Sequence, residues 1–189
     1  MKKIWLLVVT LLISTNSLGV TIQMKNLKKL LEGRKATYVE KTPDDVYSEV
    51  TRESNLSPED IEKIGKLESQ HGKFDKPIQG GSARGLFQFQ PQTAEHLMPG
   101  SSESLSDINT QADLMKKYLA VTKPENVEDA YAMHNLGPTG GRKLINADDQ
   151  ELIRRVLSKA AISGNKGLYG GKTVGDAKSK IKQKLEEGK

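Results

Sequence analysis

The sequence contains no cysteine among its 189 residues. The chain therefore has no disulfide and no cysteine that could carry an N-terminal lipid. Its three histidines (His71, His96 and His134) lack the spacing of a metal site. A phosphate-binding glycine loop followed by Lys-Ser or Lys-Thr is also absent, as is a serine nucleophile elbow. These absences predict a function that needs no metal and no cofactor.

Long hydrophobic runs are also lacking. The apolar stretch IWLLVVTLLI is ten residues long, whereas a helix needs about 20 to cross a bilayer. It follows Lys2 and Lys3 and precedes the small residues Ser17 and Gly19, a pattern typical of a secretory signal peptide over residues 1–19. We therefore expect an exported protein, placed in the periplasm, outside the cell or in a virion. The alternative is that the run stays uncleaved as an anchor.

The excess of charge is small. The chain has 29 Lys and Arg against 24 Asp and Glu, a net charge of +5, and loss of residues 1–19 lowers this to +3. No basic and aromatic pattern accompanies the charge, so the sequence lacks the signature of a nucleic-acid-binding protein. A mild positive charge instead favours an anionic polymer such as a cell wall.

The periodicity of the remaining sequence is helical, and no segment longer than a few residues alternates as a strand would. We expect a mainly α domain over residues 44–165 and a polar helical tail over residues 166–189. A basic amphipathic extension over residues 20–43 precedes the domain. Part of it, residues 20–35, could contact a membrane surface weakly or pack on the domain.

Several helix boundaries can be predicted from local signals. Ser57 and Pro58, followed by two acids, predict a helix start, and Gly72 predicts its end before a glycine-rich loop over residues 72–85. A short helix is expected after this loop, within residues 86–97. Further helices are expected over residues 109–121, 126–136 and 148–162.

An acid lies on the apolar face of the helix that begins after Ser57. Glu68 follows Ile61, Ile64 and Gly65 by seven, four and three positions, which places all four on one face. Burying an ionised carboxylate is costly unless it is paired or unless a raised pKa keeps it neutral. This position therefore suggests a functional acid, although a partly exposed glutamate at a helix end is the simpler reading.

Three segments, taken in order, resemble the soluble lytic transglycosylase family. They are LESQHG at residues 67–72, SARGLFQF at 82–89 and AYAMHNLGPTGG at 130–141. The resemblance covers about residues 44–165 and implies a lysozyme-like fold. Phe87, Ser82 and His134 depart from the methionine, glycine and tyrosine that are usual in the family. The stretch MHNLGPTGG resembles phage-encoded, virion-associated members.

The resemblance implies that Glu68 is a single catalytic acid and base. Members of this family cleave the β-1,4 bond between N-acetylmuramic acid (MurNAc) and N-acetylglucosamine (GlcNAc) in peptidoglycan and leave a 1,6-anhydro product. Most glycosidases use two carboxylates. No acid lies between Asp75 and Glu95. If Asp75 pointed into the cleft, a hydrolytic muramidase would be the alternative.

The resemblance also suggests substrate-binding residues in the first two segments. Gln88 matches a glutamine that hydrogen-bonds to sugar near the acid. Ser69 follows the acid as in the family, where it helps to position the acid or the sugar, although it could be a plain hydroxyl at a helix end. Phe87 and Phe89 could form an apolar wall for sugar faces, while core packing is the alternative for at least one of them.

In the third segment His134 and Asn135 are the candidate substrate-binding pair. By its position a neutral His134 could hydrogen-bond to Glu68 or to substrate, whereas a protonated one would lower the pKa of Glu68. A buried structural histidine is the alternative. Asn135 could fix the local backbone or bind an acetamido group.

Peptidoglycan glycan strands are therefore the expected partner, with local opening of the cell wall as the expected outcome. A component of a virion or a secretion machine is a possible second partner. The rival from another class is a catalytically silent glycan-binding component of such a machine.

Overall fold

The computed structural model describes residues 41–73, 75 and 81–187 of the chain. The expected signal peptide over residues 1–19, and the extension as far as residue 40 with its stretch 20–35, lie outside this part. Residues 41–187 belong to one compact unit.

The described chain is mainly helical, as predicted. Its β pairing is limited to two isolated bridges, Arg84 with Phe89 and Leu152 with Thr173. No helix in this part of the chain has the length and apolar character needed to span a membrane. The helices are α3 (Pro43–Val50), α4 (Pro58–Ser69), α5 (Pro91–Leu97), α6 (Ile108–Thr122), α7 (Val127–Asn146), α8 (Ile153–Val156), α9 (Lys159–Gly164), α10 (Lys166–Tyr169) and α11 (Val174–Glu187), with 3-10 turns η1 (Thr51–Glu53) and η2 (Ser101–Ser104).

Helix α4 begins where the sequence predicted. The Ser57 hydroxyl accepts from the Asp60 amide while the Asp60 carboxylate accepts from the Ser57 amide. Two of the backbone N–H groups that have no partner within the helix are therefore satisfied. The helix ends at Ser69, three residues before Gly72, because Gln70 and His71 already take left-handed backbone conformations with φ of 51° and 60°. The acid at position 68 therefore lies in the last turn of α4.

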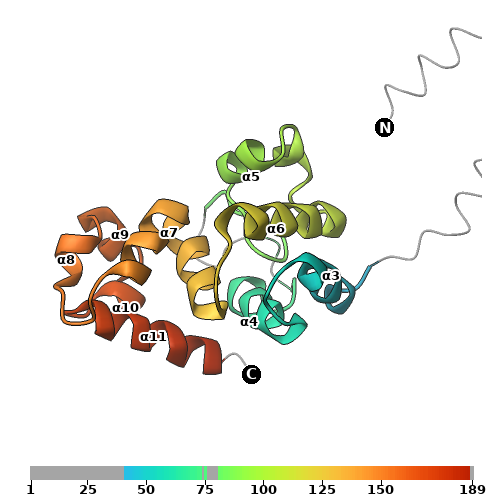
Figure 1. Ribbon diagram of the computed structural model, residues 1–189. Coiled ribbons are helices and arrows are strands. Elements are labelled where there is room, and N and C mark those ends of the chain that lie inside the picture. The colour runs from blue at the N-terminus through green and yellow to red at the C-terminus, as the bar shows by residue number, and fades with distance from the viewer. Residues whose placement is uncertain (1–40, 74, 76–80, 188–189) are drawn as a thin grey trace, which may run out of the picture. The chain divides into compact units, whose positions relative to one another are not determined.

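The core is formed by buried faces of α3, α4, α6, α7 and α11. Helix α3 packs on α4 and α6, and α11 packs on α4 and α7 (Figure 1). Gly65 allows α3 to approach closely, because an added Cβ would lie 2.6 Å from the Tyr47 hydroxyl. Ile61 and Ile64 are fully buried on the same face of α4.

The helix expected over residues 148–162 is wrong in its extent. The chain forms two short helices there, α8 and α9, separated at Leu157 and Ser158. Ser158 caps the second helix by accepting from the Ala161 amide. At the start of α8 the amide of Ile153 donates to the carbonyl of Lys172, next to the bridge between Leu152 and Thr173.

The described part of the expected tail, residues 166–187, forms the helices α10 and α11, and residue 165 is no boundary of a compact unit. Helix α11 buries one face, formed by Val174, Ala177, Ile181 and Leu185, against α4 and α7. Its polar residues cover only the remaining surface. The segment is therefore part of the core rather than a solvated appendage.

Helix α7 was expected to close at Gly137 and Pro138. The chain does leave helical geometry at Gly137, where φ is 73° and ψ is 160°. Proline is well suited to start a helix, and helical backbone resumes there and continues to Asn146. The third sequence segment thus spans a kink between two helical halves.

Candidate active site

Glu68 lies on the inner face of α4, partly exposed and largely surrounded by protein. Burial raises the pKa of its carboxyl group, while a protonated His134 and the charge of Lys184 oppose that rise. Burial is the larger effect, so the charged form is disfavoured on balance. The site therefore contains an acid that stays protonated at a higher pH than an exposed glutamate.

Ser69 connects the first sequence segment to the second. Its hydroxyl donates to the carbonyl of Leu86 over 2.7 Å and accepts from the amide of Gly72 over 2.7 Å. Ser69 is 1% exposed, so in this structure its hydroxyl is not open to substrate. The side chain instead fixes the end of α4, and with it Glu68, against the turn at residues 84–89.

The turn at residues 84–89 is held from the inside by Gln111 of α6. The buried Gln111 carboxamide accepts from the amide of Phe87 over 2.8 Å and donates to the carbonyl of Leu105 over 2.7 Å. Gly85 has a φ of 79°, and a Cβ there would clash with Leu105 and Gln111. The glycine of the second segment is therefore required both by its backbone angle and by lack of space.

The two phenylalanines of this turn are core residues. Phe87 and Phe89 are 0% and 1% exposed, so the prediction that Phe87 contacts sugar is wrong. Phe87 packs on Tyr47, and Phe89 packs on His134. Large apolar side chains are mostly found inside proteins, so both phenylalanines point into the core rather than toward solvent.

Gln88 lies in the same turn with a φ of 51°. Its amide nitrogen donates to the carbonyls of Gly85 and Asp75, over 2.8 and 3.3 Å, and the residue is 8% exposed. Both hydrogens of this nitrogen are therefore used inside the protein. The structure gives the Gln88 nitrogen a role in shaping the turn, and hydrogen bonding of Gln88 to sugar stays a prediction.

His134 connects the third segment to the second. Its Nε2 lies 2.8 Å from the carbonyl oxygen of Phe87, and a carbonyl can only accept, so Nε2 carries the hydrogen. Edge-on contacts with Phe89 and Tyr118 hold the ring. His134 is near enough to Glu68 to influence the pKa of its carboxyl group, while the Nε2 hydrogen bond is made to the backbone.

Three residues of the site were missed by sequence reasoning: Tyr131, Tyr169 and Lys184. Lys184 donates to the Tyr131 hydroxyl over 3.1 Å, and the Tyr169 hydroxyl donates to the Asn135 carboxamide over 3.0 Å. Burial and the nearby Glu68 raise the pKa of both tyrosines. The Asn135 carboxamide is therefore held by Tyr169 of α10, and both roles expected for Asn135, fixing the local backbone or binding an acetamido group, stay predictions.

Two cavities lie near the residues around Glu68. One, of about 600 Å³, lies between α5, α6 and the kink of α7 and includes Tyr118, which packs on His134. Its rim carries Val121, a large hydrophobic residue that is 63% exposed. The other, of about 700 Å³, lies between the α9–α10 segment and α11 and includes Lys184.

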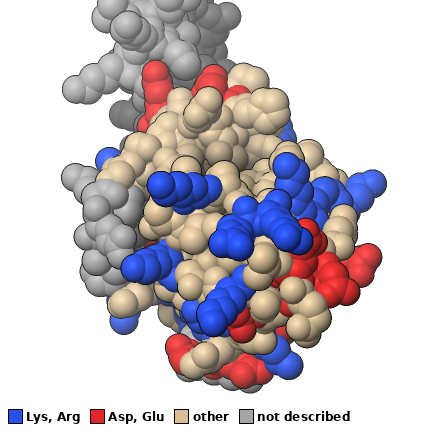
Figure 2. All heavy atoms as spheres, turned by 90° about the vertical axis from the view of Figure 1, so that its left-hand side faces the viewer, with Lys and Arg blue, Asp and Glu red and all other residues tan. Residues whose placement is uncertain are grey.

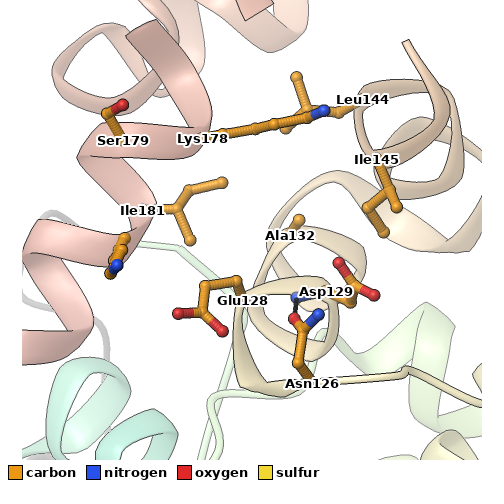
Figure 3. Close-up of a pocket in the computed structure, with 10 residues that line it drawn as sticks. Asn126, Glu128, Asp129, Ala132, Leu144, Ile145, Lys178, Ser179 and Ile181 are labelled. Carbon is orange, nitrogen blue, oxygen red and sulfur yellow. Dashed lines mark hydrogen bonds between the residues drawn. The ribbon is translucent and has the colours of Figure 1, made fainter. Parts of the chain in front are cut away.

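A third cavity, of about 490 Å³, lies between α7 and α11. Figure 3 shows Glu128 and Asp129 of α7 and Lys178 of α11 around an apolar floor that includes Ile181. Burial and neighbouring acids raise the pKa of Asp129. No residue of the Glu68 cluster lines this cavity, so we do not assign the candidate site to it.

The described residues contain no group of three or more His, Cys, Asp or Glu side chains that could hold a metal ion. Asp75, the alternative second acid, is exposed, and its carbonyl accepts from the amide of Gly85. No family model, curated protein or solved structure matches the chain.

Proposed function

We propose that the protein is a lytic transglycosylase with a lysozyme-like domain that cleaves the MurNAc–GlcNAc bond of peptidoglycan. The observation that carries this proposal is the meeting of the three sequence segments. Ser69 binds the first to the second, and His134 binds the third to the second. Glu68 belongs to the first of these segments, and burial raises the pKa of its carboxyl group.

The proposed reaction uses Glu68 twice. It first gives its proton to the bridging oxygen while the bond from that oxygen to C1 of MurNAc breaks, because the departing sugar oxygen is a poor leaving group without a proton. The carboxylate then takes the proton of the C6 hydroxyl, whose oxygen bonds to C1 and closes the 1,6-anhydro ring. The proton on Glu68 is restored, and no water is consumed.

The charges around Glu68 suit both steps. Burial favours the protonated carboxyl group for the first step, and the positive charge of Lys184 favours the carboxylate that the second step needs. His134 commits its Nε2 hydrogen to Phe87. Nδ1 is therefore the ring atom that remains for substrate or for Glu68.

The second candidate is a hydrolytic muramidase that acts on the same bond. Asp75 favours it, because the Asp75 carbonyl accepts from Gly85 and Gln88. Both belong to the turn at residues 84–89, to which Ser69 of the first segment is also bound. Its exposed carboxyl group would have to activate a water. The reducing ends of the products distinguish the two reactions.

The proposed setting is the cell wall, reached by export through residues 1–19. A virion or a secretion machine that must cross the wall is the proposed larger partner. A catalytically silent glycan-binding component of such a machine remains the alternative outside enzymes.

The test is digestion of purified peptidoglycan by the wild type, Glu68→Gln and Glu62→Gln. Glu62 lies on the same helix and forms surface ion pairs with Lys66 and His71, so its change removes an equal charge away from the site. We expect Glu68→Gln to lose about 10²–10⁴-fold in turnover while still sedimenting with peptidoglycan, and Glu62→Gln to stay near wild type. Binding without fragment release by the wild type would leave only the non-catalytic reading.

A further inference from the structure

The cavity between the α9–α10 segment and α11 is basic. Lys166, Lys180 and Lys184 line it, together with Glu187. The carboxylate of Glu187 already accepts from the side-chain amide of Gln183 over 2.8 Å. Among the described residues the cavity, called the basic pocket below, therefore has an excess of two positive charges.

The basic pocket adjoins the acid through Lys184. This lysine donates to Tyr131 over 3.1 Å, and its charge lowers the pKa of Glu68. An ammonium group has three donors, and Tyr131 takes one of them. A ligand in the pocket would therefore lie beside the group that is proposed to act on the sugar.

The pocket belongs to a face with a strong excess of positive charge. Residues 153–184 contain nine Lys or Arg and one acid, Asp176, although the whole chain has a net charge of only +5. Figure 2, which faces the α8–α11 side, shows Lys and Arg across the middle of this face and Asp and Glu toward its edges. Such a field attracts anionic groups to the pocket.

We propose that the basic pocket binds a carboxylate of the stem peptide that branches from MurNAc next to the bond to be cleaved. This inference rests on the proposed function. MurNAc carries its peptide on the lactyl group, within one sugar of the scissile bond, so the peptide leaves the strand close to Glu68. Lys166 and Lys180 provide the charge, and the carboxamides of Asn165 and Gln183, which also line the pocket, suit peptide groups.

The pocket therefore gives a preference for peptide-bearing strands over bare glycan. The tested variant is Lys166→Ala/Lys180→Ala, which leaves Lys184 in place because that residue contacts Tyr131. The control variant, Lys172→Ala/Lys182→Ala, removes the same charge from lysines that do not line this pocket. Both are made in a Glu68→Gln background, so that binding is measured without turnover.

The ligands are a GlcNAc–MurNAc disaccharide with its peptide and the same disaccharide without it. We expect the parent and the control to prefer the peptide-bearing ligand by about 3–30-fold, the effect of two partly exposed ion pairs, and the pocket variant to lose this preference. Equal binding of both ligands by the parent would overturn the inference, as would an equal loss in the control. Failure of the proposed function would appear separately, as absence of cleavage by the wild type.

Discussion

At the scale of single residues, Glu68 carries a carboxyl group whose ionisation is opposed by its surroundings. Burial raises its pKa in the folded protein above the value in the unfolded chain. Between the two values the folded protein binds more protons, so its free energy of unfolding falls as the pH rises through that window. Each unit of pKa difference corresponds to about 1.4 kcal/mol. The proposed catalytic acid is thus destabilising at neutral pH.

We therefore expect Glu68→Gln to be more stable than the wild type near pH 8, because glutamine does not ionise, and the difference to shrink as the pH approaches about 4. Denaturant unfolding of both proteins at several pH values measures this. Glu62→Gln is the control and should change stability by at most about 1 kcal/mol, since its ion pairs are on the surface. A Glu68→Gln protein that is less stable at every pH would show that the carboxylate is favourably paired.

At the scale of elements, the turn at residues 84–89 is the piece to which both neighbouring segments are bound. Gly85→Ala should destabilise the protein by several kcal/mol, because it combines a left-handed backbone angle with contact against Leu105 and Gln111. Gly164→Ala is the matched control. An added Cβ there meets nothing within 4 Å, so we expect a neutral or stabilising effect of up to about 1 kcal/mol. Thermal unfolding measures both, and equal effects would contradict the structure of the turn.

Helix α11 supplies a second prediction at this scale. Ile181 is 2% exposed on the face that packs on α4 and α7. Ile181→Ala should therefore lower the free energy of unfolding by about 2–5 kcal/mol, measured by denaturant titration. Ser179→Ala, on the exposed side of the same helix, should change it little. A loss of under 1 kcal/mol for Ile181→Ala would mean that α11 is the solvated tail expected from its polar composition.

These elements also show which parts of the fold could be predicted from the sequence. The start of α4 depends on Ser57 and its neighbours, which are adjacent in the chain, and it was predicted correctly. The break at Leu157 and Ser158 was not predicted, although Ser158, which caps α9, is a residue type that favours a helix start. In α11 the spacing of Val174, Ala177, Ile181 and Leu185 was a visible sign of a buried face, but the surrounding lysines obscured it.

The site was predictable to a similar extent. Glu68, His134 and Asn135 lie in recognisable segments, and the structure brings them into one region. Tyr169 and Lys184 lie 28 and 43 residues beyond the end of the third segment, so only the packing of α10 and α11 brings them to Glu68. Ser69 and Phe87, although well placed in the sequence, are buried because the turn at residues 84–89 packs on the end of α4 and on Tyr47 of α3.

At the scale of the whole molecule, the acid and the excess positive charge are separate in sequence and neighbours in space. Glu68 comes from α4, whereas the basic residues come from α8–α11. Lys184 connects the two regions, because it lines the basic pocket and also donates to Tyr131 beside the acid. An enzyme that acts on a branched, anionic polymer would use this arrangement to hold the branch while the acid reaches the main strand.

The most direct test of the central claim is the chemical nature of the new ends in a peptidoglycan digest. Purified peptidoglycan is incubated with the wild type or with Glu68→Gln, and the soluble fragments are analysed by mass spectrometry. We expect fragments that end in 1,6-anhydroMurNAc, and we expect Glu68→Gln to release almost none. Reducing ends heavier by one water would instead identify a hydrolase and contradict the account of Glu68 as the single acid and base.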